Sequence, residues 1–453
     1  MKNASLKRIL KYLLVGTGCF IVLAFVSFKL YMSYTKYFQD DIPPPDDSQL
    51  MITRDYISED LNGYNVLMEA TWPLFESPID PDFRNSSETV NDDELDKMIE
   101  ICRERLSIIE RAVQYRDFQE PIPKCCDEDK PNYPAIGDLS RLRIAIARRD
   151  MRQGNSEAAV NNILVVLKTG QAMEISSTSL ICYAFGLAIK NMALSAIYDI
   201  VVTYDPDISL INDIVSNIAD SHESNDGFRN ALKGEYLLSK YVFQKTEAYR
   251  NKELKKRETL KFAEKLQYIS NPKGHAFFRV NHTYKNWIDT MLPVIESVGK
   301  PYKDMKLENV TPTSKGMNWK AVNWLRATAT GNFIGEILLE VGKPNLKRLF
   351  DKSFYTEFMI SSLETMIALK SYRNRNGTLP ESLSELVPEY IDSIPHDPFD
   401  GKPIRYDPDK KIIYSVGTDS IDDGGTADKH LYSSVSFKDL EKEKDFVIDL
   451  SKL

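Results

Sequence analysis

The residues of this chain with the clearest chemical potential are four aspartates in one short loop near the carboxyl end. The loop reads TDSIDDGGTAD from Thr418, and its aspartates are Asp419, Asp422, Asp423 and Asp428. Four carboxylates so close together repel one another unless a cation neutralises them, and the glycines let the backbone turn its carbonyls inward. Calcium accepts about 6–8 such oxygens, so the loop is a candidate calcium site. The alternative is a solvated Asp-Gly turn that needs no ion.

The segments before this loop are expected to form a small α+β unit that positions it. Phe354–Tyr372 carries apolar residues at helical spacing. Asn376-Gly377 ends that helix, because glycine tolerates the left-handed conformation of a helix terminus. Three prolines between residues 395 and 403 cannot donate to a sheet ladder, so they mark turns and edges. Two short strands are then expected at Ile404–Tyr406 and Lys411–Val416, directly before the acidic loop.

This order of helix, proline-rich loop, hairpin and acidic glycine loop resembles the globular part of the major pseudopilin of type II secretion systems. The matching residues are Ala368, Tyr372, Gly377, Pro380, Leu383, Leu386, Pro395, Asp397, Pro398, Gly401, Pro403, Tyr406, Tyr414, Ser415, Gly417, Asp419, Gly424, Gly425 and Asp428. The resemblance implies that Asp419 and Asp428 are side-chain ligands of calcium, with Asp422 and Asp423 as possible additions. It covers about a quarter of the chain. Because the amino terminus lacks the pseudopilin cleavage motif and the glutamate of the pilin helix, the chain is not expected to polymerise as a pilin does.

Few sequence motifs in this chain indicate catalysis. The five histidines are His222, His275, His282, His396 and His430. They form no HExxH motif, and the chain lacks a GxSxG elbow, a Walker loop and a dinucleotide fingerprint. His396-Asp397 stands between two prolines and is interpreted as a turn in a structural motif. A carboxylate pair for glycoside hydrolysis stays open, because such pairs come from distant parts of a fold. The sequence favours a protein that is not an enzyme.

The amino terminus predicts an uncleaved membrane anchor. Tyr12–Phe28 is uncharged and apolar, and with its extension to residue 32 it reaches the ~17–25 residues that cross a bilayer. Four basic residues precede it, which keeps the amino end cytoplasmic. A cleaved signal peptide and a lipoprotein site at Cys19 are the alternatives. No small-x-small cleavage site follows the apolar core, however, and the position of Gly16 lacks the apolar residue of a lipoprotein site.

The predicted organisation follows from this anchor. It comprises a basic cytoplasmic segment (1–11), a transmembrane signal anchor (12–32), an acidic and proline-rich spacer (33–50), an α-helical ectodomain (51–350) and the pseudopilin-like module (351–453). The chain is therefore expected to cross the inner membrane of a bacterium once, with its bulk in the periplasm. The net charge of −8 argues against nucleic-acid binding, since no basic face is available for phosphates.

Five cysteines are too few for a disulfide scaffold. Outside the predicted anchor are Cys102, the vicinal pair Cys125-Cys126, and Cys182. An oxidising compartment permits a bridge from the pair to either of the others, and buried free thiols are the alternative. Zinc is disfavoured, because the pair is not spaced as CxxC and no histidine is nearby.

The fold class is expected to be mainly α, with an irregular helical array or bundle between the anchor and the small α+β module. Helices are predicted at Asp93–Tyr115, Asp138–Gln153, from Gly154-Asn155 to Gly170, Ser179–Thr203, Ile208–Ala219 and Arg229–Tyr249. A second, more polar helix is then expected to about Tyr268, followed by helices within His275–Glu296 and at Gly335–Val341. The segment around Gly154 resembles a tetratricopeptide helix pair. The whole plan resembles a class of bacterial membrane-anchored proteins, which implies architecture and no particular activity.

Two classes of function stay open. The first is an extracytoplasmic interaction or structural protein with protein partners, linked to a secretion-like or pilus-like envelope assembly and stabilised by calcium. The second is an envelope hydrolase that acts on glycan or peptide through carboxylates in a helical groove. The first predicts a groove without convergent, pKa-perturbed carboxylates, whereas the second requires such a pair. The sequence favours the first.

Overall fold

The computed structural model describes residues 41–73, 77–79, 91–124, 131–204, 208–220, 222, 225–258, 278–307, 332–342, 346–427 and 444–453. The predicted anchor, Cys125, Cys126 and Asp428 lie outside these residues. The chain divides into two compact units, each of which is described by itself. Unit 1 comprises Met1–Gln49, Ser239–Thr290 and Pro312–Pro344, and unit 2 comprises Leu50–Leu238, Met291–Thr311 and Asn345–Leu453.

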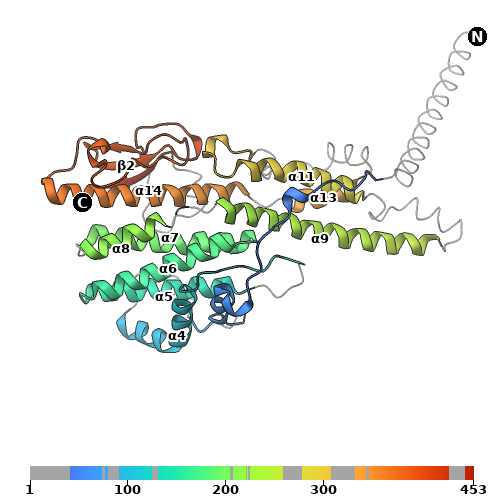
Figure 1. The fold of residues 1–453 in the computed structure, drawn as a ribbon, viewed down its shortest axis with the longest axis horizontal. Helices are drawn as coiled ribbons and strands as arrows, with labels where there is room; N and C mark the ends of the chain where they lie inside the picture. Colours follow the sequence, from blue (N-terminus) through green and yellow to red (C-terminus); the bar gives the residue numbers. More distant parts are fainter. Residues whose placement is uncertain are drawn as a thin grey trace, which may run out of the picture. The chain divides into compact units, whose positions relative to one another are not determined.

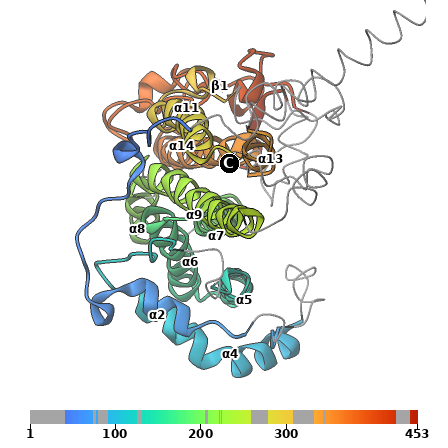
Figure 2. The same cartoon turned by 90° about the vertical axis from the view of Figure 1, so that its right-hand side faces the viewer.

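Unit 2 is built mainly from helices that pack in chain order. Its helices are α2 (Gly63–Glu69), α4 (Asp92–Ala112), α5 (Tyr133–Arg152), α6 (Ser156–Ser176), α7 (Leu180–Thr203), α8 (Ile208–Ala219), α14 (Leu346–Asn376) and the first turns of α9 (Asn225–Glu258). Each of α4, α5 and α6 contacts the next helix, and α14 lies against α7 and α8 (Figures 1 and 2). The prediction of a mainly α fold is confirmed.

Polar residues placed before the helices explain several of their starts. The side chain of Asn91 accepts a hydrogen bond from the backbone N of Glu94 and begins α4, and Ser179 caps Cys182 in the same way at α7. Gly154 has φ +81° in the turn between α5 and α6, a conformation that glycine adopts without strain. The predicted turn at Gly154-Asn155 is therefore confirmed.

The crossing of α6 and α7 depends on two glycines. A Cβ added at Gly170 would lie 2.5 Å from the backbone N of Lys190, and one at Gly186 would lie 2.8 Å from the backbone N of Glu174. Lys190 and Glu174 form an ion pair of 2.5 Å in which both side chains are 1% exposed. The prediction that a helix ends at Gly170 is wrong, since α6 continues to Ser176 and the glycine serves the helix contact instead.

Helix α9 approaches the end of α6 just as closely. A Cβ at Gly227 would lie 2.3 Å from the carbonyl oxygen of Glu174, and one at Gly234 only 1.6 Å from that of Thr178. The prediction of two helices after Gly227 is corrected, because α9 runs without a break from Asn225 to Glu258. The charged residues beyond Tyr249 are compatible with an uninterrupted helix.

The carboxyl-terminal part of unit 2 is a small antiparallel sheet on α14. Its strands are β1 (Arg405–Asp407), β2 (Ile412–Ser415) and β3 (Phe446–Asp449), in the order β1-β2-β3. The two predicted strands and the helix end at Asn376-Gly377 are confirmed, with Gly377 at φ +80°, whereas β3 was not predicted. Phe446 packs its ring edge-on against Tyr355 of α14, with ring centroids 5.5 Å apart.

Three hydrogen bonds fasten α14 to α7 along its length. Tyr183 and Ser353 share one between their hydroxyls at 3.1 Å, and the amide of Asn191 donates to Thr356 at 2.6 Å. The Lys370 ammonium donates to the carbonyl of Val201 at 2.7 Å, near the carboxyl end of α7. This last contact satisfies a carbonyl that the helix itself leaves without a donor.

Unit 1 contains the later turns of α9, most of α11 (Val280–Ser297) and α13 (Phe333–Gly342). The carboxylate of Asp41 accepts from the backbone N of Asn281 at 2.7 Å and of His282 at 3.1 Å, at the start of α11. Phe278 and Trp287 are almost fully buried and belong to the core of this unit. Within the described residues, only α7 is long and apolar enough to cross a membrane, and 56% of its apolar window is buried.

Candidate functional site

The aspartates of the acidic loop contact groups of the chain itself. The carboxylate of Asp422 accepts from Nε of Arg405 at 2.9 Å. Asp423 lies 3.8 Å from the Lys444 ammonium, and Oδ1 of Asp419 accepts from the backbone N of Ile421 at 2.9 Å. Asp428 falls outside the described residues, so the structure brings together three of the four predicted ligands only as neighbours along one loop.

Asp445 organises this loop from a distant position in the sequence. Its buried carboxylate accepts from the backbone N of Gly425 at 2.8 Å and of Thr426 at 3.2 Å. Burial is the largest influence on Asp445 and raises its pKa above the usual value, although these hydrogen bonds oppose that effect. No sequence motif predicted a role for Asp445, because its contact with the loop forms only in the folded protein.

The chain already supplies cations to this region. Besides Arg405 and Lys444, the ammonium of Lys410 donates to the carbonyl of Gly424 at 2.6 Å. In the described ranges, no three His, Cys, Asp or Glu side chains gather closely enough to hold a metal ion. The Arg405 guanidinium thus occupies a carboxylate oxygen of Asp422 that a calcium ion would need as a ligand. The complete set of calcium ligands stays a prediction.

Calcium can be tested by its effect on the thermal melting of the full chain in detergent. If the site forms, millimolar calcium should raise the melting temperature by several degrees, because a ligand that binds only the native state stabilises it. Asp419→Ala should abolish the rise, whereas Asp422→Asn should preserve most of it, since Arg405 engages that carboxylate. An unchanged melting temperature of the wild type with calcium or chelator would remove the predicted site.

The Asp397 carboxylate links the turn after Pro395 to the sheet. It is fully buried and accepts from the backbone N of Phe399 (2.9 Å), from the Ser415 hydroxyl (2.8 Å) and from the Arg405 guanidinium (2.8 Å). Burial is the main influence on this group and raises its pKa, although the hydrogen bonds oppose that effect. Arg405 also contacts Asp400 at 2.6 Å. The contacts of Asp397 therefore serve the structure of the module.

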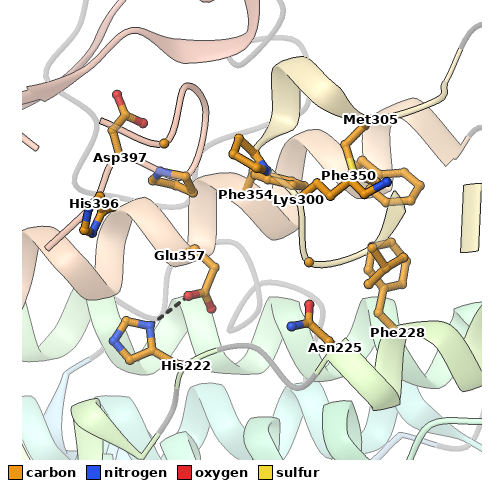
Figure 3. A pocket seen from close by; sticks show the side chains of 15 residues that line it. His222, Asn225, Phe228, Lys300, Met305, Phe350, Phe354, Glu357, His396 and Asp397 are labelled. Atoms are coloured by element: carbon orange, nitrogen blue, oxygen red, sulfur yellow. Dashed lines mark hydrogen bonds and ion pairs between the residues drawn. The ribbon is translucent and has the colours of Figure 1, made fainter. Parts of the chain in front are cut away.

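A pocket of about 270 Å³ lies within unit 2, where four segments distant in sequence meet. They are the start of α9 with residue 222, the segment after α11, the first half of α14, and the turn after Pro395. The lining residues are His222, Asn225, Phe228, Val298, Gly299, Lys300, Pro301, Met305, Phe350, Phe354, Glu357, His396, Asp397, Pro398 and Gly401. Figure 3 shows the His222–Glu357 pair on one side of the pocket and the rings of Phe228 and Phe350 on another.

His222 is held between two carboxylates of α14. Its Nδ1 lies 2.8 Å from Glu357, and its Nε2 lies 3.4 Å from Glu364. The hydrogen bond with Glu357 and then that with Glu364 raise the pKa of His222 to about 10, against an opposing effect of burial. The ring is therefore an imidazolium at neutral pH and fastens its segment to α14.

We expect this pair to give the stability of the protein a specific pH dependence. Because the folded pKa of about 10 exceeds the ordinary value of 6.5, the stabilisation is complete below pH 6.5 and is lost as pH rises toward 10. His222→Gln should lower the melting temperature by a few degrees at most at pH 6, because the ring is 44% exposed and solvent screens the pair. The difference from wild type should shrink steadily up to pH 10. A difference that is constant over this range would contradict the assignment.

Sequence reasoning did not find this pocket. Phe354 was predicted as part of a helix and His396 as part of a turn, but nothing in the local pattern joins them to His222 or Lys300. No family model, no curated protein and no solved structure matches the chain.

Proposed function

We propose that the chain is a membrane-anchored, extracytoplasmic interaction protein, and that the pocket in unit 2 receives part of a protein partner. The observation that carries this proposal is that the carboxylates lining the pocket are engaged in ion pairs. Glu357 is paired with His222, and Asp397 is paired with Arg405. The remaining walls are largely apolar, as in sites that bind a ligand through a few placed polar groups.

The hydrolase alternative has weaker support from the same residues. Hydrolysis by two carboxylates needs both groups to reach the substrate, one as acid and the other as base or nucleophile. Asp397 is fully buried, and backbone, hydroxyl and guanidinium donors surround its oxygens. Its side chain has no free path to a bound molecule, so the lining offers binding groups and not a reacting pair.

The location in the envelope is proposed from the amino-terminal sequence. Residues 12–32 supply an apolar run of spanning length, and the basic residues before it place the amino end in the cytoplasm. Unit 2 would then lie in the periplasm, where secretion-like assemblies offer protein partners. The acidic loop adds calcium as a proposed stabilising ion.

Site-specific photo-crosslinking in bacterial cells tests the proposal. A photoreactive residue at His396, which is exposed and lines the pocket, should give a discrete adduct with one or a few envelope proteins. The matched control is Ile101, which is 50% exposed on α4 and does not line the pocket.

Adducts of the same pattern from both positions, or none from His396, would contradict a pocket-directed interaction. Purified full chain should also leave peptidoglycan and denatured protein substrates intact. Release of soluble fragments that Glu357→Gln abolishes would instead establish the hydrolase.

A further inference from the structure

The floor of the pocket is apolar and made of buried side chains. Phe228, Met305, Phe350 and Phe354 each expose less than a tenth of their surface, and the ring centroids of Phe228 and Phe350 are 4.5 Å apart. An apolar cavity of about 150 Å³ holds a benzene molecule. The volume of about 270 Å³ thus leaves room for one ring or branched side chain and a small polar group.

One cationic side chain of the pocket has no ion-pair partner among the described residues. Glu357 and Asp397 line the pocket and are both ion-paired. Glu357 shares His222 with Glu364, and Asp397 shares Arg405 with Asp400 and Asp422. The Lys300 ammonium also lines the pocket, yet it makes no ion pair with any residue in the described part of the chain. An apolar floor beside a lysine without an ion-pair partner favours a ligand that combines an apolar group with an anion.

An exposed amide and an exposed imidazole also line the pocket. Asn225 and His396 are both exposed and line the pocket with Lys300. Asn225 lies directly beside Gly299, where an added Cβ would lie 3.1 Å from its amide nitrogen. The segment of Lys300 and the start of α9 are therefore close together, and the Asn225 amide is a hydrogen-bond donor in the same lining. A carboxylate accepts hydrogen bonds from both kinds of group.

We propose that the pocket binds an apolar group that carries a carboxylate, with the apolar part on the phenylalanine floor and the carboxylate at Lys300. This inference rests on the proposed function and gives the chemistry of the ligand. A polypeptide that ends in a large apolar residue offers this combination, and so does a free arylalkanoic acid. The following arms separate the two sources.

The test is fluorescence anisotropy with the full chain in detergent and a fluorescein-labelled pentapeptide, Gly-Ser-Gly-Ser-Phe, with a free carboxyl end. We expect saturable binding that is at least about tenfold tighter than that of the carboxamide form of the same peptide, since only the acid pairs with Lys300. The peptide with a terminal serine should also bind at least about tenfold more weakly, because it leaves the apolar floor unfilled.

Two lysines of one segment provide matched variants. Lys300→Gln should weaken binding of the free acid about tenfold and leave the carboxamide unchanged. Lys303→Gln should change neither, because Lys303 is exposed on the same segment but does not line the pocket. Unlabelled 3-phenylpropionate that displaces the peptide at a similar concentration would identify a small acid as sufficient. Displacement only at much higher concentration would identify a chain end.

The inference is overturned if acid and carboxamide bind equally, if Lys300→Gln has no effect, or if no probe binds at millimolar concentration. Its failure is distinguishable from failure of the proposed function. Discrete crosslinks from His396 together with no binding of the acid would leave an interaction pocket of different chemistry. If neither discrete crosslinks from His396 nor binding of the free acid is observed, both proposals are refuted.

Discussion

Gly234→Ala is expected to destabilise unit 2 severely, to the point that little folded protein accumulates. The added Cβ would lie 1.6 Å from the carbonyl oxygen of Thr178, far below the 3.0 Å that real Cβ atoms respect. The obstacle is backbone, so no side chain can rotate out of the way. Helix α9 must move away from the end of α6, and this opens the core around Phe228 and Leu232, which are buried. We expect a loss above about 4 kcal/mol, the range of severe core disruption.

The matched control is the same substitution at Gly137 of α5. The nearest atom to a Cβ there is 3.7 Å away, an ordinary contact. Because alanine favours helix more than glycine, Gly137→Ala should stabilise by up to about 1 kcal/mol. Urea titrations of the full chain, followed by circular dichroism, compare the midpoints without assuming a two-state transition. Equal midpoints for Gly234→Ala and wild type would show that α9 does not press on Thr178.

Glu120→Ala is the second substitution with a large expected effect. The buried carboxylate of Glu120 accepts from the Tyr133 hydroxyl and from the backbone N of Thr178, both at 2.6 Å. It also accepts from the backbone N of Ser179 at 2.9 Å and from its hydroxyl at 2.6 Å. The residue thereby joins the segment between α4 and α5 to the first residue of α5 and to the amino end of α7. Each buried donor left without an acceptor costs about 1–3 kcal/mol, so we expect a total loss above about 3 kcal/mol.

Two variants separate this network from a general effect of charge removal. Glu120→Gln keeps the side-chain shape, but its NH₂ group faces donors, so an intermediate loss is expected. Glu104→Ala, at an exposed site on α4, should change the urea midpoint very little. Hydrogen exchange at the backbone amides of Thr178 and Ser179 should accelerate in Glu120→Ala. Protection equal to that of the wild type would contradict the proposed cap.

The helices and turns were predictable because their causes are local. Gly154 and Gly377 both adopt positive φ at a helix end, and the apolar residues between such turns repeat at helical spacing. The hairpin of β1 and β2 follows from short apolar runs between prolines and an acidic loop. Glycine is ambiguous, however. Gly170 has the same local signature as a helix end, and only the presence of α7 beside it shows that it serves a close crossing.

The candidate sites depend on contacts that local patterns do not contain. Asp445 acts on a loop some 20 residues earlier, and the predicted ligand Asp422 meets Arg405 of β1. The pocket requires residue 222, the segment after α11, α14 and the turn after Pro395 at once. No local pattern in the sequence joins these segments, so their convergence could be found only in the fold.

The attachment of α14 also determines how the carboxyl-terminal sheet responds to mechanical load. The helix is unbroken over 31 residues, a rod of about 46 Å. Its hydrogen bonds to α7 at Ser353, Thr356 and Lys370 are distributed along the rod, and the sheet packs on the same helix. Tension applied along the axis of the rod would load these bonds together in shear. The sheet would then resist detachment strongly, because each of these hydrogen bonds would carry part of the force and all would have to break together.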